Sequence, residues 1–421
     1  MIDVLEVYLA KTLVGRLTLL TGDRAFFAFE ADYLNDLNRP VLSQSFLKAS
    51  GDILPETKIT QTKLPPYFSN LLPEGHLRSY LAHRGGINPA REFRLIALLG
   101  ADLPGAVIVT EPGMPLEAMA VRQDHTENKR KTVAEEPYRF SLAGVQLKFS
   151  ALAESTGGLT IPANGAGGDW IIKLPAQNFV QVPENEWAML HLASQIGIPV
   201  PQVRLVSLDK IGGLPDLGVL SGTQALVVKR FDRGDFSKGA SRQRIHIEDF
   251  AQVYHLFPAD KYSKVSYANI ANMVWTLTGE QGLVDFIQRL TFTILIGNGD
   301  MHLKNWSFIY ADGRTPQLSP AYDFVSTIPY IPNDSLALSL SGTKNMRAVT
   351  LEHFKKLTKK ARLPEHIVLN TVRGTVAATR QAWDADHKHY ELSGEIQKRI
   401  ELHMKSVFPD VSSVSFSYTS V

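Results

Sequence analysis

The stretch Gly297-Asn298-Gly299-Asp300-Met301-His302-Leu303-Lys304-Asn305 is the most informative part of this sequence. It follows an apolar run, Phe292 to Ile296, and precedes a strand-like run, Trp306 to Tyr310. Polar groups between two buried segments lose hydration, which costs free energy, so a stretch of them is expected only where the groups serve a function. We therefore expect a functional loop here.

The spacing inside this loop is typical of phosphoryl transfer. Asn305 follows Asp300 by five residues, as in a kinase catalytic loop, where the Asp orients or deprotonates a hydroxyl and the Asn holds Mg²⁺. A second acid, Asp323, lies in Ser319-Pro-Ala-Tyr-Asp-Phe324, where a kinase has its metal-binding Asp. Asn305 and Asp323 would supply hard oxygen ligands suited to Mg²⁺. We expect an ATP-dependent phosphotransferase.

Composition and length limit the possible number of domains and the possible classes of protein. A chain of 421 residues should form two or three domains, and 44% hydrophobic with 20% charged residues is ordinary for a globular protein. The net charge of +2 provides no global basic field for nucleic acid. The absence of cysteine excludes disulfides, cysteine nucleophiles and thiolate metal sites. With no secretory signal and no apolar run near the ~20 residues that span a bilayer, we expect a cytoplasmic protein with no membrane partner.

The first part of the chain reads as a small β-rich unit. Residues 1–31 alternate as in an antiparallel meander, and His76–Arg84 and Ala90–Leu99 are typical of helices. The motif around Leu71-Leu72-Pro73-Glu74-Gly75 is interpreted as a helix-start turn with packing leucines, and nothing in this region looks catalytic. The predicted organisation is residues 1–110 as an N-terminal subdomain, 111–136 as a charged linker, 137–235 as a lobe with a phosphate loop and hinge, and 236–421 as a helical lobe.

Two segments of the middle lobe could contact nucleotide phosphates. In Phe140–Lys148, small residues would let backbone amides approach a phosphate and Lys148 would add charge, although an ordinary strand remains the alternative because the stretch is not a Walker A motif. Lys173 lies in a short apolar strand and Glu186 in the next helix. This is the order of a kinase N-terminal lobe, in which the ion pair fixes the lysine on the phosphates.

The remaining polar residues leave alternatives open. Ala225–Arg233 is expected to be a strand leading into a hinge, whose backbone would pair with adenine while Asp232 reaches the ribose. The basic segment Lys229–Arg244 is either a solvated loop or a contact for nucleotide, nucleic acid or an acidic partner. His302 and Lys304 could neutralise charge on the transferred group, although His302 could instead cap or hydrogen-bond locally.

The chain after the hinge is expected to be mostly helical. The basic face of the helix that includes Lys355 is either solvated or a nucleic-acid contact. The predicted helices are Ile247–Tyr254, Ser266–Thr276, Leu283–Ile296, Glu352–Ala361, Pro364–Asp384 and Ser393–Val407.

The ordered combination of these motifs resembles the HipA family of serine/threonine kinase toxins from bacterial type II toxin–antitoxin modules. The early stretch Asn70–Gly75 resembles the signature of that family's N-terminal subdomain, so the resemblance covers nearly the whole chain. The six motifs that carry it are Ser141-Leu-Ala-Gly-Val-Gln-Leu-Lys148, Ile171-Ile-Lys-Leu-Pro175, Asn185-Glu186, Lys229-Arg-Phe-Asp-Arg233, Gly297–Asn305 and Pro320-Ala-Tyr-Asp323.

This resemblance implies an α+β, protein-kinase-like fold of two lobes, with an extra N-terminal β-rich subdomain and a mostly helical C-terminal lobe. It implies phosphorylation of a serine on an aminoacyl-tRNA synthetase, glutamyl-tRNA synthetase in the best-known case, which halts translation and induces dormancy and persistence. The implied partner is a HipB-like helix-turn-helix antitoxin that restrains the kinase and represses the operon on operator DNA.

The resemblance also assigns roles to residues. Asp300 matches the catalytic aspartate, and Asn305 and Asp323 match the Mg²⁺ ligands. Ser141 matches an autophosphorylated serine, and a phosphate there would repel ATP by adding nearly two negative charges beside its loop. The residues expected to contact ATP are Ala143, Gly144, Val145, Gln146, Lys148, Lys173, Glu186, Lys229, Phe231, Asp232, His302 and Tyr322.

One departure and two alternatives accompany this prediction. Phe324-Val325 follows Asp323, so the glycine of the usual Asp-Phe-Gly motif is absent. The alternatives are a small-molecule kinase of the aminoglycoside-phosphotransferase type and a catalytically idle corepressor bound to DNA. The N-terminal subdomain argues against the first, and the intact set of Asp300, Asn305 and Asp323 argues against the second.

Overall fold

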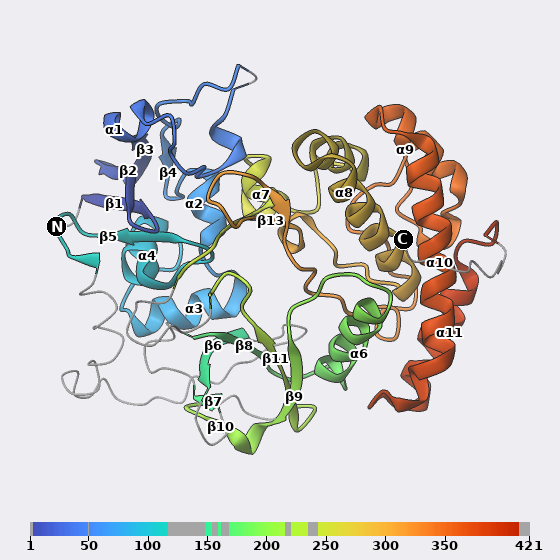
Figure 1. Cartoon of the computed structure of the whole chain (residues 1–421). Coiled ribbons are helices and arrows are strands. Elements are labelled where there is room, and N and C mark those ends of the chain that lie inside the picture. The colour runs from blue at the N-terminus through green and yellow to red at the C-terminus, as the bar shows by residue number, and fades with distance from the viewer. Residues whose placement is uncertain are drawn as a thin grey trace.

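The computed structural model describes residues 3–48, 50–116, 148–153, 159–160, 168–214, 220–234 and 243–411. In Figure 1 an N-terminal β-sheet with its helices lies at one end and long C-terminal helices lie at the other, and a second sheet with helix α6 lies between them along the lower edge of the view. The α+β class, the N-terminal β-rich part and the helical C-terminal region expected from the sequence are confirmed.

The N-terminal sheet is an antiparallel meander, as the alternation of residues 1–31 predicted. Its strand order is β4-β3-β2-β1-β5, so the last strand returns to pair with the first. Phe27 and Phe29 of β3 pack with Phe46, Tyr67 and Phe68 in an aromatic core on one face of this sheet. The strands are β1 Val4–Leu9, β2 Thr12–Leu20, β3 Arg24–Phe29, β4 Thr60–Gln61 and β5 Val107–Thr110.

Helices of the N-terminal part cover this sheet. Every residue of α2 is buried, and Leu71 and Leu72 pack in the core as the sequence predicted. The helices are α1 Ala31–Asn35, α2 Pro66–Leu71, α3 Gly75–Arg84 and α4 Glu92–Leu99.

The second sheet brings two lysines together. Strand β8 lies between β6 and β11, and Lys148 of β6 is directly opposite Lys173 of β8, so both side chains point to the same face. Helix α6, Val182–Gln195, packs against β9 and β11. The described strands are β6 Lys148–Ala153, β7 Leu159–Thr160, β8 Trp170–Lys173, β9 Val203–Ser207, β10 Ile211–Gly212 and β11 Gln224–Lys229.

The predicted helix over Ile247–Tyr254 is wrong in its first half. Residues His246–Asp249 form strand β12, which pairs with β13, and only Phe250–Val253 is helical, as α7. The backbone groups of β12 are satisfied by β13, which lies about sixty residues further along the chain. Strands β13 Ser307–Tyr310 and β14 Gln317–Leu318 complete this sheet.

Helix α8, Tyr267–Ile296, joins two helices that the sequence predicted separately. Gly279 interrupts it with φ 68°, and Gly297 ends it in the left-handed conformation with φ 66°, which turns the chain into the polar loop. The three later helices lie within two residues of their predicted bounds, as α9 Leu351–Ala361, α10 Glu365–Asp386 and α11 Gly394–Ser406. Within the described ranges, no helix is both long enough and apolar enough to cross a membrane.

Candidate active site

One buried amide side chain connects the two acids predicted to do the chemistry. Asn298 accepts a hydrogen bond from the backbone N–H of Asp300 at 2.9 Å and donates one to the backbone oxygen of Asp323 at 3.0 Å. Asn305 donates through Nδ2 to the backbone oxygen of Asp300 at 2.9 Å. Asp300, Asn305 and Asp323 are therefore held side by side, although Asp323 lies in another segment of the chain.

Asp323 has an unusual backbone conformation. Its φ is +57°, in the left-handed region that non-glycine residues seldom adopt. Such a conformation persists only where surrounding contacts fix it, and the hydrogen bond from Asn298 to the Asp323 carbonyl is one of them. It presents the carboxylate to the lysines of the second sheet.

Two lysines bind the Asp323 carboxylate. Lys148 Nζ lies 2.9 Å from Oδ2 and 3.2 Å from Oδ1. Lys173 Nζ donates to Oδ1 and also to Glu186, so the ion pair that the sequence predicted between Lys173 and Glu186 is present. Lys173 and Glu186 are only 5% and 2% exposed, so this pair is shielded from bulk water.

The charges of this cluster are set by competition between burial and ion pairing. Burial alone would raise the pKa of Asp323, but Lys148 and Lys173 hold it well below its ordinary value. Burial alone would lower the pKa of Lys173, but Asp323 and Glu186 raise it. Burial raises the pKa of Glu186 in spite of Lys173. Asp323 therefore stays ionised and Lys173 stays protonated at neutral pH.

Helix α6 is tied to the segment that follows Asp323. Asn185 donates through Nδ2 to the backbone oxygen of Ser326 at 2.9 Å and accepts from its N–H at 3.0 Å. Because Glu186 is the next residue, this reciprocal pair fixes the carboxylate that holds Lys173. In the motif Asn185-Glu186, Asn185 thus anchors α6 to the segment after Asp323, and Glu186 is the ion-pair partner of Lys173.

The donor set beside the loop fits Mg²⁺. No group of three or more His, Cys, Asp or Glu that could hold a metal ion is found among the described residues. Mg²⁺ in phosphoryl-transfer sites needs only one or two protein oxygens, because waters and substrate phosphates supply the rest. The Asp323 carboxylate and the Asn305 amide, whose nitrogen is already bonded to the loop, match this requirement.

Tyr262 is a site residue that the sequence analysis missed. Its phenol donates a hydrogen bond to Oδ1 of Asp300, and its ring lies edge-on to His302, with centroids 5.0 Å apart and an interplanar angle of 83°. Tyr262 is in a loop before α8, far from Asp300 in sequence. Only the fold brings the two residues together, so no local motif could have identified it.

His302 is neutral in this environment. Burial lowers its pKa to about 4, and Nδ1 has no hydrogen-bond partner in the described part of the chain. A neutral imidazole can donate one hydrogen bond but carries no charge, and the expected contact of His302 with the transferred group stays a prediction. The local cap is also absent, because the side chain makes no such bond to the following turn.

Lys304 has several partners inside the protein, and its expected neutralisation of charge on the transferred group stays a prediction. Its ammonium donates to the backbone oxygen of Asn70 at 2.8 Å and to Asn70 Oδ1 at 3.3 Å. It also lies 3.2 Å from Glu74 Oε1 and 3.6 Å from Asp249 Oδ2. Lys304 is thus held by two residues of the N-terminal part together with Asp249, and sequence spacing gives no information about such distant partners.

Two predicted nucleotide contacts, Phe231 and Tyr322, lie beside each other. Their ring centroids are 5.8 Å apart at 34°. The Tyr322 hydroxyl lies 2.5 Å from Ser307 Oγ and donates to the backbone oxygen of Lys304 at 3.0 Å. This aromatic pair therefore borders both the hinge and the polar loop, while its contact with a nucleotide stays a prediction.

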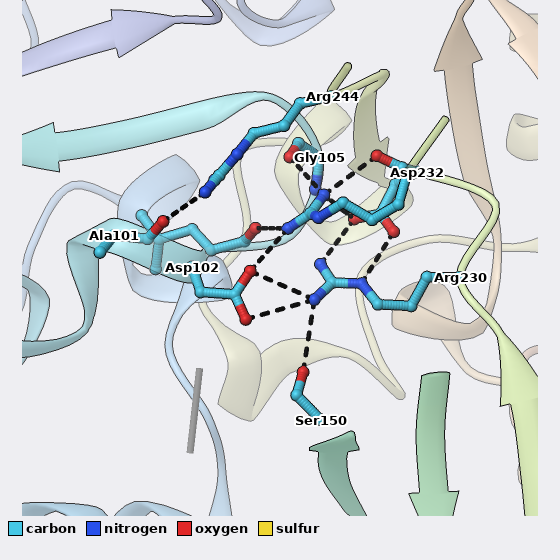
Figure 2. A network of polar contacts seen from close by, with 9 residues as sticks. Ala101, Asp102, Gly105, Ser150, Arg230, Asp232 and Arg244 are labelled. Atoms are coloured by element: carbon cyan, nitrogen blue, oxygen red, sulfur yellow. Dashed lines mark hydrogen bonds and ion pairs between the residues drawn. The ribbon is translucent and has the colours of Figure 1, made fainter. Parts of the chain in front are cut away.

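Asp232 has partners other than the expected ribose. Its carboxylate accepts from Arg230 and Arg233 and from the backbone N–H of Gly105 at 2.8 Å, as Figure 2 shows. Arg230 and Arg233 also bind Asp102, so the N-terminal part and the hinge meet in a buried network. In the described part of the basic segment, Arg230, Arg233 and Arg244 lie in or beside this network rather than in solvent.

Several predictions concern residues outside the described ranges. The phosphate-loop residues Ala143, Gly144, Val145 and Gln146 and the serine Ser141 lie there, as do most of the predicted linker and residues 235–242 of the basic segment. Lys229 ends β11 and is described, but its predicted nucleotide contact also stays a prediction.

Comparisons with known proteins agree over nearly the whole chain. Residues 5–110 match the HipA N-terminal domain family and residues 140–383 the HipA-like C-terminal domain family. A protein named as a kinase, Y4dM of Sinorhizobium fredii, is 47% identical over 412 residues, covering 96% of this chain and 97% of that one. The serine/threonine-protein kinase toxin HipA of Shewanella oneidensis is 26% identical over 361 residues, covering 77% of this chain and 76% of that one.

A solved structure supports the fold. It contains Shewanella oneidensis HipA with HipB and its operator DNA, and the match has a TM-score of 0.72 at 20% identity, covering 96% of this chain and 95% of that one. At this identity the likeness concerns the fold alone. The predicted kinase-like fold with an additional N-terminal subdomain is thereby confirmed.

Proposed function

The chain belongs to the HipA family and is a kinase, and we propose that it is a serine/threonine protein kinase that acts as the toxin of a toxin–antitoxin pair. The observation that carries the proposal is the arrangement around Asn298. This side chain joins Asp300, beside Asn305, to Asp323, which two lysines bind. These are the parts that phosphoryl transfer requires.

Asp300 is the group that would handle the proton. As the acceptor hydroxyl oxygen forms a bond to the γ-phosphorus of ATP, its proton passes to the Asp300 carboxylate, and the bond to ADP breaks. The position of this carboxylate is fixed at the backbone, where its N–H bonds to Asn298 and its carbonyl to Asn305. Such positioning is the main contribution that a protein makes to this reaction.

Lys148 and Lys173 would carry the positive charge for the phosphates. Kinase membership implies that ATP is the phosphoryl donor, and both lysines already bind an anionic group, the Asp323 carboxylate. Mg²⁺ held by Asp323 and Asn305 would neutralise charge on the transferred phosphate. Lys173 would remain oriented by Glu186 throughout.

The partners proposed for this kinase follow from its relatives. Shewanella HipA has been solved with HipB and operator DNA, which supports a HipB-like helix-turn-helix antitoxin and repression through operator DNA for this chain. The proposed substrate is an aminoacyl-tRNA synthetase, with glutamyl-tRNA synthetase the first to test. Its phosphorylation in the cytoplasm would halt translation and induce persistence. Autophosphorylation of Ser141 is proposed as the off-switch.

Intact-mass measurement after incubation with ATP and Mg²⁺ tests this proposal. The wild type should gain one phosphate, and Ser141→Ala and Asp300→Asn should gain none. Ser141→Ala should still phosphorylate a synthetase, whereas Asp300→Asn should not. Chelation of Mg²⁺ should abolish both reactions in the wild type. Full activity of Asp300→Asn would contradict the assigned mechanism, and a wild type that phosphorylates neither itself nor any synthetase would contradict the proposed substrate class.

A further inference from the structure

Glu74 reaches out of the N-terminal subdomain toward the catalytic loop. It occupies the N-cap position of α3, where the shorter side chains of Asp, Asn, Ser or Thr accept a hydrogen bond from the helix's own backbone. Its side chain makes no such bond. Instead, Oε2 accepts from Lys261 at 2.9 Å and Oε1 lies 3.2 Å from Lys304. The carboxylate therefore joins two lysines of the C-terminal lobe rather than capping its own helix.

Asn70 makes the second part of this contact. It is 4% exposed, and both its backbone oxygen and its Oδ1 accept from Lys304. Its Nδ2 donates to the backbone oxygen of Leu256 at 2.7 Å and to that of Pro66 at 2.8 Å. A single buried amide thus connects α2 with two separate segments of the C-terminal lobe.

The two lysines lie next to residues that hold Asp300. Lys304 precedes Asn305, which donates to the Asp300 backbone oxygen. Lys261 precedes Tyr262, which donates to the Asp300 carboxylate. The two segments are also joined directly, because the backbone N–H of Leu303 donates to the backbone oxygen of Lys261 at 3.2 Å. Glu74 therefore connects both of the segments that contact Asp300.

Glu74 is the anion that Lys261 and Lys304 share at this contact, and Lys304 also lies 3.6 Å from Oδ2 of Asp249. Burial alone would raise the pKa of the Glu74 carboxyl, but Lys304 and Lys261 lower it below its ordinary value. The carboxylate is therefore ionised at neutral pH and lies between two cations. Without it, Lys261 would lose the anion that it shares with Lys304, and Lys304 would keep only the more distant Asp249 as an anionic partner, so both side chains would be held less firmly.

We propose that Asn70 and Glu74 are positioning residues for the catalytic loop, so that the N-terminal subdomain completes the kinase active site. This inference rests on the proposed function, because it takes Asp300 as the group that accepts the proton. Neither residue would touch ATP or the acceptor. They would act by holding Lys304 and Lys261, and through them the orientation of Asp300.

A comparison of two glutamates in the same subdomain tests the proposal. Glu74→Gln removes the shared charge while keeping the size of the side chain. Glu30→Gln is the matched control, since Glu30 pairs with Arg16, has a side chain 27% exposed against 36% for Glu74, and does not contact the catalytic loop. Glu74→Asp keeps the charge with a shorter reach. For each variant, kcat, KM for ATP, melting temperature and hydrogen exchange of residues 297–305 are measured.

Glu74→Gln should lower kcat about tenfold or more, because small displacements of catalytic groups have effects of this size. KM for ATP and the melting temperature should stay near wild type, and exchange in residues 297–305 should become faster. Glu74→Asp should recover part of kcat, and Glu30→Gln should match the wild type. Unchanged exchange in Glu74→Gln would overturn the proposal whatever the kinase activity. Unchanged kcat would overturn it while leaving the proposed function intact.

Discussion

The N-terminal subdomain meets the rest of the protein at two charged contacts that differ in burial. The hinge cluster consists of Asp102, Gly105, Arg230, Asp232 and Arg233, and its charged side chains are at most 7% exposed (Figure 2). The catalytic-loop contact consists of Asn70, Glu74, Lys261 and Lys304, and its glutamate is 36% exposed. Buried ion pairs strongly affect stability when broken, whereas exposed ones contribute little. The first contact should therefore govern folding and the second catalysis.

The hinge cluster pairs two carboxylates with two guanidinium groups, and Arg244 beside it adds a third positive charge. Asp102 and Asp232 face Arg230 and Arg233, and Arg244 lies beside them and donates to the backbone oxygen of Ala101. Burial lowers the pKa of Arg244 to about 10, and Arg233 adds to the effect. Neither carboxylate can be removed without leaving buried positive charge, so this region should respond most strongly to mutation.

Asp232→Asn should have the largest effect on stability. It leaves Arg230 and Arg233 buried with only Asp102 to compensate them, which should cost about 3–5 kcal/mol of unfolding free energy. Denaturant titration measures the loss, with Asp209→Asn, an exposed acid of the same lobe, as a control that should leave stability unchanged. A raised KM for ATP with normal stability would instead support the ribose contact predicted from the sequence.

Glu248→Gln should have the next largest effect, and it should depend on pH. Glu248 is fully buried on β12, accepts from the Gln44 backbone and Tyr310, and has no cation partner among its contacts. Burial raises its pKa from 4.5 to about 7. The folded protein thus binds more protons than the unfolded chain between these values, so stability falls as pH rises through this window and remains reduced above it.

Glutamine does not titrate, so the Glu248→Gln variant should lack this pH-dependent loss of unfolding free energy. The loss that it avoids should be on the order of 2–3 kcal/mol at pH 8 and almost nothing at pH 4.5. Melting temperatures of the wild type and of Glu248→Gln between pH 4.5 and 8 measure this difference in pH dependence. Glu56→Gln, at an exposed position of the N-terminal subdomain, should keep the wild-type pH dependence. Parallel curves for wild type and Glu248→Gln would show that Glu248 is ionised in the folded state and contradict the assignment.

The sequence predicted those parts of the site whose signal lies in one short segment. Asp300 and Asn305 share a loop, and Lys173 and Glu186 follow each other as strand and helix, so spacing and order were sufficient. β12 was mistaken for a helix because its hydrogen-bond partner β13 lies far along the chain. Tyr262 and Glu74 were missed for the same reason, since each meets its partner only in the folded protein.

Asn70→Ala should have a smaller effect on stability than either buried carboxyl. It removes the side-chain donor to the Leu256 backbone oxygen and the Oδ1 acceptor for Lys304, while the Asn70 backbone oxygen still accepts from Lys304, and loss of such buried hydrogen bonds costs about 1–2 kcal/mol. Asn70→Ala should also lower kcat, because Asn70 contacts the catalytic loop, whereas Asp232→Asn should act mainly on stability. Denaturant titration and steady-state kinetics on the same preparation measure the two effects. Wild-type kcat in a destabilised Asn70→Ala would assign this residue to folding alone.

Lys261→Met should have the smallest effect. Lys261 is one of two cations on a partly exposed carboxylate, so its loss should change stability by less than about 1 kcal/mol and kcat by about two- to fivefold. Lys264→Met is the matched control, since Lys264 lies in the same loop and forms its ion pair with the partly exposed Asp260 rather than with Glu74. Because Lys261 would act through Glu74, adding Lys261→Met to Glu74→Gln should lower kcat no further. Additive losses would mean that Lys261 reaches Asp300 through Tyr262 alone, and would remove the Lys261 half of the catalytic-loop contact.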